Sequence, residues 1–98
     1  MSSLRTDQAE LWWQAEDSLL AESPVWVAAE QAFFWVDIAA RRIRRHDGSA
    51  RPARSWVLPQ KVGCIAPRAG GGWIAALQDG VYAATLPAAG GPAELSPL

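Results

Sequence analysis

Short apolar segments separated by turn signals constrain this chain more than any other feature. The segments start roughly every 8–12 residues, as in an antiparallel meander. Asp47-Gly48, Asp79-Gly80 and Gly70-Gly71-Gly72 stand between them and accept the positive φ of tight turns. We therefore expect an all-β fold. The predicted strands are 25–27, 32–38, 42–46, 54–58, 63–66, 73–77, 81–86 and 93–96.

A weak internal repeat organises these strands into two similar units. At an offset of 38 positions Val27 matches Ile65, Trp35 matches Trp73, and Ile43 matches Val81. An all-β repeat of about 40 residues with four strands is typical of a β-propeller blade. A blade is covered on both faces, which explains the unbroken apolar run 33–36. The chain is predicted to hold about two antiparallel four-stranded blades, too few to close a ring, so oligomerisation through blade faces is possible.

Composition excludes several classes of protein. The formal charge of −1 and the pI of about 5.7 give no general attraction to nucleic acid. Cys64 is the single cysteine, which excludes an intrachain disulfide, and no apolar run is long enough for a membrane span. We expect a cytoplasmic protein that binds neither nucleic acid nor membrane. Residues 1–9 are predicted to be a flexible N-terminus and residues 10–98 one domain, in which 10–15 form a strand or begin a helix.

Glu22 is the candidate metal ligand. It lies in Glu22-Ser23-Pro24, immediately before the strand at 25–27. The first strand of a propeller blade lines the central channel, which would place this carboxylate at the channel mouth. Hard divalent cations bind several oxygen ligands, so one glutamate cannot complete a site. The alternative is an ordinary loop or capping residue.

Other reactive side chains have simpler expected roles. Asp37 is predicted to bond a turn backbone or Arg41 or Arg42, and His46 to be a solvated turn residue. Cys64 is expected to be a small buried hydrophobe. With one histidine and no Gly-x-Ser-x-Gly, the sequence carries no signal for a catalytic triad.

The basic run and the tryptophans also have structural explanations. The run 41–45 is predicted to be an edge strand protected by charge. Trp35, Trp56 and Trp73 are expected in the core. The triple glycine at 70–72 lacks the Lys-Ser/Thr ending of a phosphate loop and is expected to be a turn.

Several of these motifs, taken in order, resemble one family. Glu22-Ser23-Pro24-Val25-Trp26 is followed by Phe34-Trp35-Val36-Asp37-Ile38 and then by Ile43-x-Arg45-x-Asp47. Gly72-Trp73-Ile74-Ala75-Ala76-Leu77 and Asp79-Gly80-Val81 continue the likeness. Together they resemble the start of the SMP-30/gluconolactonase/regucalcin-like family, over about residues 10–98.

The resemblance implies a six-bladed β-propeller with one divalent cation, Ca, Zn, Mn, Mg or Fe, in its channel. The implied activity is hydrolysis of sugar lactones to aldonic acids, in which the metal polarises the carbonyl. The family's first metal ligand carries over to Glu22. Its other metal ligands and its substrate-binding residues would lie beyond position 98, so no catalytic residue is expected here and the chain alone should be inactive. Ala21 and Ala39-Ala40 depart from the family pattern, where glycine is usual.

Two alternatives remain open at this point. Three copies of a two-blade unit could assemble into one propeller and bring three Glu22 carboxylates around one axis. The chain could instead be a non-enzymatic interaction module that uses Trp12, Trp13 and Trp26 on its surface.

Overall fold

The structure, a computed structural model, describes the backbone of residues 21–98 and the side chains from residue 24 onward. The predicted flexible segment 1–9, the predicted element at 10–15 and the tryptophans Trp12 and Trp13 lie outside the described residues. Within residues 21–98 the chain forms strands and turns and no helix, as the sequence predicts.

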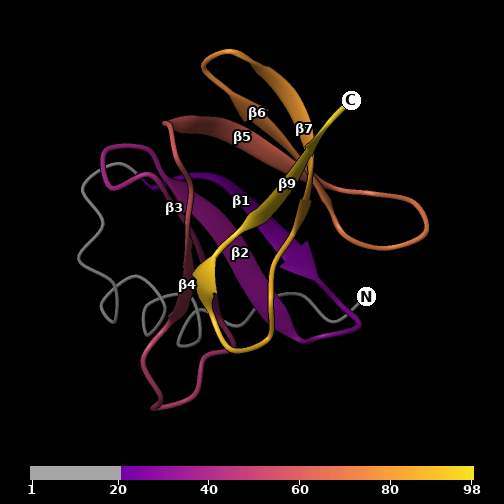
Figure 1. Cartoon of the computed structure of the whole chain (residues 1–98). Coiled ribbons are helices and arrows are strands. Elements are labelled where there is room, and N and C mark those ends of the chain that lie inside the picture. Colours follow the sequence, from indigo (N-terminus) through magenta and orange to yellow (C-terminus); the bar gives the residue numbers. More distant parts are fainter. Residues whose placement is uncertain (1–20) are drawn as a thin grey trace.

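The strands form two sheets (Figure 1). The first sheet has the order β1-β2-β3-β4-β8, and its strands are β1 (Ala21–Val27), β2 (Ala32–Asp37), β3 (Arg42–His46), β4 (Arg54–Val57) and β8 (Gly91–Pro92). The second has the order β5-β6-β7-β9, and its strands are β5 (Val62–Pro67), β6 (Trp73–Leu77), β7 (Gly80–Thr85) and β9 (Glu94–Pro97). Each of the eight predicted strands is present, which confirms the expected all-β arrangement.

One strand was not predicted. Gly91–Pro92 lies between the predicted strands 81–86 and 93–96, but it forms β8, which pairs with β4 in parallel. The Ala93 amide adds a hydrogen bond to the Val57 carbonyl at 2.9 Å. All other strand pairs are antiparallel. A two-residue strand depends on its partner and not on its own residues, so local sequence carries no signal for it.

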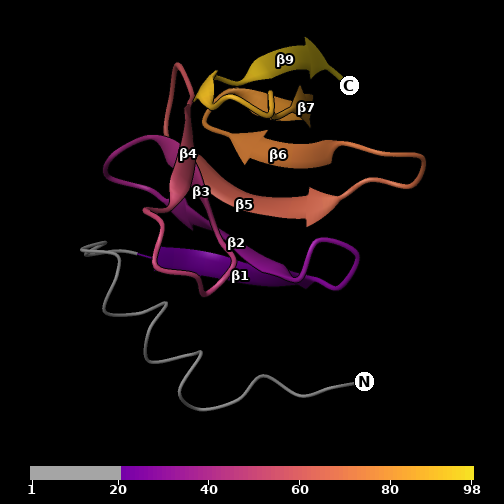
Figure 2. The same cartoon turned by 90° about the horizontal axis from the view of Figure 1, so that it is seen from below.

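Each sheet begins with a bulged strand. In β1 the register shifts between Glu22 and Val25, where Pro24 has no amide hydrogen to give to the ladder. In β5 the register shifts between Val62 and Cys64, at Gly63. The two bulged ends lie at the same end of the molecule, and the hairpin turns after β1 and β5 lie at the other (Figure 2).

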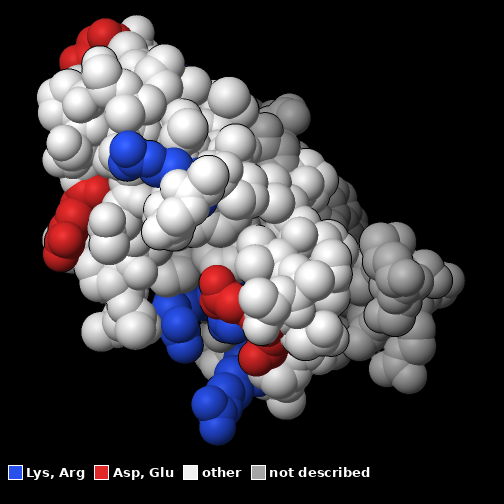
Figure 3. Space-filling model, turned by 90° about the vertical axis from the view of Figure 1, so that its right-hand side faces the viewer, with Lys and Arg blue, Asp and Glu red and all other residues white. Residues whose placement is uncertain are grey.

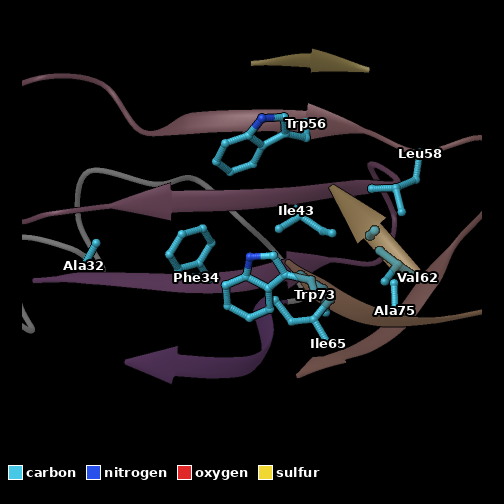
Figure 4. Close-up of a cluster of buried hydrophobic side chains, with 11 residues drawn as sticks. Ala32, Phe34, Ile43, Trp56, Leu58, Val62, Ile65, Trp73 and Ala75 are labelled. Carbon is cyan, nitrogen blue, oxygen red and sulfur yellow. The ribbon is translucent and has the colours of Figure 1, made fainter. Parts of the chain in front are cut away.

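The core lies between the facing surfaces of the two sheets (Figure 4). The Phe34 ring lies 4.6 Å from the Trp73 ring and 6.0 Å from the Trp56 ring, centroid to centroid. Burial of each such side chain contributes about 1.5–3 kcal/mol. The cluster is Ala32, Phe34, Val36, Ile43, Trp56, Leu58, Val62, Ile65, Trp73, Ala75 and Ala84.

The apolar run in β2 is buried on both of its faces, as the sequence predicts. Phe34 and Trp35 point to opposite faces of β2, and only 2% and 0% of their surfaces are exposed. Trp56 and Trp73 are also buried, so the expected core role of these three tryptophans is confirmed. The residues 70–72 form a turn with positive φ at each glycine, again as expected.

Candidate functional site

Glu22 stands near the beginning of β1, where that strand meets the end of β2. Its backbone pairs with Val36, and the backbone of Ala21 pairs with Asp37. The bulge that follows accommodates Pro24, which has no amide hydrogen, and regular pairing resumes at Val25. The side chain of Glu22 lies outside the described residues, so its metal-binding role stays a prediction.

The residue that precedes the bulge in the second sheet is not a metal ligand. Val62 stands immediately before the β5 bulge, as Glu22 does before the β1 bulge. Val62 is fully buried and belongs to the core. Among the residues that the structure describes, no three His, Cys, Asp or Glu side chains come together in a way that could hold a metal ion. Val62 itself therefore offers no oxygen ligand.

Asp37 closes the turn after β2 and pairs with an arginine. Its Oδ1 accepts a hydrogen bond from the Ala40 amide at 3.2 Å, which confirms the predicted turn role. Its Oδ2 lies 3.4 Å from the Nε of Arg44. The predicted partners were Arg41 and Arg42. Asp37 pairs directly with Arg42 in the ladder, but Arg44, two residues along on the same face, is the diagonal neighbour within reach.

The basic run is not an edge strand, and that prediction was wrong. β3 lies between β2 and β4 in the first sheet. Its arginines tolerate this position because each has a polar neighbour. Arg42 donates to the Ser55 hydroxyl at 3.1 Å, and Arg45 Nε donates to Glu30 Oε1 at 3.0 Å.

His46 and Cys64 both differ from expectation in their exposure. His46, predicted to be solvated, ends β3 with 2% of its surface exposed, and its Nδ1 accepts the Gly48 amide at 2.8 Å. Cys64, predicted to be buried, is exposed. The bulge at Gly63 reverses the side-chain alternation, so that Ile65 instead of Cys64 shares the core face with Val62.

A polar cluster around Asp79, not found from the sequence, occupies the turn between β6 and β7. The Tyr82 hydroxyl donates to Asp79 Oδ1 at 2.9 Å, and the Asp79 amide donates to Gln60 Oε1 at 3.1 Å. Hydrogen bonding to the Gln60 side chain, and then to Tyr82, lowers the pKa of Asp79 below 3.8. The same bond to Asp79 raises the pKa of Tyr82 above 10.0. The turn lies at the end of the molecule where β1 begins (Figure 2).

Trp26, expected as a surface anchor in one alternative, is partly covered. Its ring lies 5.0 Å from the Phe33 ring at an angle of 58°. Within residues 21–98 no helix is long and apolar enough to cross a membrane.

Comparison with known proteins agrees with the sequence motifs. The profile of the SMP-30/Gluconolactonase/LRE-like region matches residues 20–97. A 6-deoxy-6-sulfogluconolactonase of Pseudomonas putida is 40% identical over 67 residues, which are 68% of this chain and 23% of that protein. A regucalcin of Danio rerio is 31% identical over 61 residues, which are 62% of this chain and 21% of that protein. The matches thus span less than a quarter of the length of these curated relatives. The profile covers most of the chain, which therefore belongs to the SMP-30/gluconolactonase/LRE-like family.

Proposed function

We propose that this chain is the N-terminal part of a divalent-metal-dependent lactonase that converts sugar lactones to aldonic acids. Its two sheets would be the first two blades of a six-bladed β-propeller, within a domain that starts near residue 10. One observation carries the proposal: the family match over 20–97 includes Glu22-Ser23-Pro24, which opens β1 at a bulge. The name of the sulfogluconolactonase relative supports a sugar lactone as the substrate class.

The proposed role of Glu22 is to supply one oxygen ligand to the metal. A bound divalent cation would polarise the lactone carbonyl and make an attacking water more acidic. Among the side chains that the structure describes, no three His, Cys, Asp or Glu come together to form a metal site of their own. The contribution of this chain would be to hold the Glu22 backbone in place through the bulge and the pairing with Val36. We therefore expect this chain alone to show no lactonase activity.

A chimera tests the role of Glu22 directly. Residues 20–97 would replace the matching segment of the Pseudomonas putida sulfogluconolactonase, and lactone hydrolysis and bound metal would be measured together. We expect an active chimera in which Glu22→Gln lowers both activity and metal content, by at least about tenfold for the loss of a charged ligand. Glu94→Gln, at an exposed carboxylate of β9, is the matched control. Metal content and activity unchanged by Glu22→Gln in a folded chimera would refute the role.

Assembly of three copies into one propeller is the second candidate. It is favoured by the outer face of the second sheet, where Val81 is 48% exposed and Cys64 and Ala66 are exposed. Such a face suits a neighbouring sheet better than water. Light scattering of the purified chain tests it, since a trimer supports the candidate and a monomer excludes it.

A further inference from the structure

A hollow of about 300 Å³ lies between the two sheets, away from the start of β1. The turn residue Glu30 and the β6 entry at Gly72 both line it, which places it at the end opposite Glu22. Its volume is at the lower limit of small-molecule sites in proteins. The lining residues that matter are the rings of Phe34, Trp56 and Trp73 and the charged groups of Glu30, Arg45 and Arg54.

The inner wall of the hollow is aromatic. The Phe34 and Trp56 rings are nearly parallel, at 12°, and the Trp73 ring is tilted by 44° against Phe34 (Figure 4). The indole Nε1 of Trp56 already donates to the Pro87 carbonyl at 2.6 Å. The polar edge of that ring is thus occupied, and of the three rings Trp73 is the most exposed, at 7%.

The rim of the hollow carries an excess of positive charge. Arg45 and Arg54 are direct partners in the β3–β4 register, on the face that bears Phe34 and Trp56. Like charges in directly opposite positions destabilise a sheet. A nearby negative charge reduces the repulsion between two such arginines. Here the Glu30 carboxylate lies 3.0 Å from the Nε of Arg45.

Arg54 is the uncompensated member of this pair. Among residues 24–98 no carboxylate lies within ion-pair distance of its guanidinium. Glu30 is engaged with Arg45, and its side chain is 48% exposed. A smaller hollow of about 60 Å³ shares Arg45 and Arg54 and is also lined by Arg51 and Asp47, whose charges offset each other. Figure 3 shows basic and acidic side chains close together toward the lower margin of one face of the molecule, with further charged side chains at its upper left.

We propose that this hollow binds a small organic anion. Its carboxylate, sulfonate or phosphate group is held by the Arg54 guanidinium, with Arg45 beside it, in the planar geometry that suits oxyanions. Its carbon body lies against the exposed part of Trp73 and against Leu86, over the buried rings of Phe34 and Trp56. The site is at the opposite end of the sheets from Glu22, so a test of anion binding there does not depend on the lactonase proposal.

Nuclear magnetic resonance on the full isotope-labelled chain tests this site. Sodium benzoate, sodium gluconate and inorganic phosphate are the probes, with benzamide and glucose as uncharged counterparts. We expect benzoate or gluconate to shift the indole signals of Trp56 and Trp73 in a saturable manner. The uncharged counterparts should bind at least about tenfold more weakly, because they cannot form the charged hydrogen bond to Arg54. Which of the two acids binds better distinguishes a flat aromatic body from a sugar acid.

Substitutions separate a specific site from general charge attraction. Arg54→Gln should weaken anion binding about tenfold or more, and Arg54→Lys, which keeps the charge and loses the planar fork, should weaken it less. Lys61→Gln removes the same charge at the other end of the sheets and should leave binding unchanged. If Arg54→Gln does not fold, anion binding by Arg54→Lys is compared with binding by the unchanged chain and by Lys61→Gln. Equal binding of benzoate and benzamide, equal loss in Lys61→Gln, or shifts from phosphate alone would overturn the proposal.

Discussion

The indole of Trp56 donates a 2.6 Å hydrogen bond to the carbonyl oxygen of Pro87, and this bond connects β4 of the first sheet to the chain that leaves β7 of the second. The same segment then pairs with the edge of β4 as β8 before it returns to the second sheet as β9. The two sheets are thus joined by polar contacts as well as by the apolar core between them.

Loss of the Trp56 hydrogen bond should destabilise the whole domain. We expect Trp56→Phe to lower the free energy of unfolding by about 1–3 kcal/mol, because the Pro87 carbonyl loses its donor and the smaller ring leaves a gap beside Phe34. Urea denaturation followed by circular dichroism measures the change. Trp26→Phe, at a half-buried ring packed on Phe33, is the control and should cost less. Equal losses in the two variants would contradict the role given to the bond.

Removal of the Asp37 charge should be costly although the residue is not a proposed ligand. Asp37→Asn removes the charge that faces Arg44 and weakens the acceptor for the Ala40 amide, at a side chain that is 9% exposed. We expect a loss of about 1–3 kcal/mol, reduced from the value for a fully buried pair because Arg44 is partly solvated. Thermal unfolding of this variant beside Asp47→Asn, an exposed carboxylate, measures it. A loss no larger than that of Asp47→Asn would contradict the assignment.

The Asp79 cluster should respond to pH in a defined direction. The folded pKa of Asp79 is lowered, so its contribution to stability is present above its unfolded pKa of 3.8 and is lost as the pH falls through the folded value. Tyr82 has a raised pKa, so its contribution is present below 10.0 and is lost as the pH rises through the folded value.

Two substitutions check the causes of the Asp79 shift. Gln60→Leu should raise the pKa of Asp79 more than Tyr82→Phe does, since the Gln60 side chain is the larger cause. Nuclear magnetic resonance titration of the Asp79 carboxyl measures both. The reverse order, or no rise in either variant, would show that these contacts do not set the pKa in solution.

The turn between β2 and β3 stores backbone strain at a residue other than glycine. Arg41 has a φ of 55°, a left-handed conformation that costs an L-residue about 1–2 kcal/mol, while its amide bonds the Ile38 carbonyl at 3.2 Å. Arg41→Gly should therefore be neutral or stabilise the fold by up to about 1 kcal/mol. Arg51→Gly, at an exposed residue with no such φ, should be destabilising or neutral. A clear loss of stability in Arg41→Gly would show that the backbone conformation of Arg41 is not strained.

Local patterns in the sequence predicted most of the fold, because turn dipeptides and apolar alternation act over a few residues. The strands from 32 to 86 form where they were expected, and the apolar run at Phe34 and Trp35 is covered on both faces. The Glu22-Ser23-Pro24 motif also identified the family, but β1 starts at Ala21 and includes this motif, whereas the predicted strand started at 25. A proline without an amide hydrogen requires a break in the ladder, so the bulge there has a local cause.

Only the tertiary structure decided which side chains are covered and which segments from distant parts of the chain meet. A single bulge at Gly63 turns Cys64 away from the core face of the sheet and Ile65 toward it. A strict alternation of inward and outward side chains through the bulge would predict the reverse. β8 exists because Gly91 reaches Trp56, and the cationic hollow exists because β3 and β4 set Arg45 opposite Arg54. These contacts depend on strand pairing across long stretches of chain, which residue type alone does not determine.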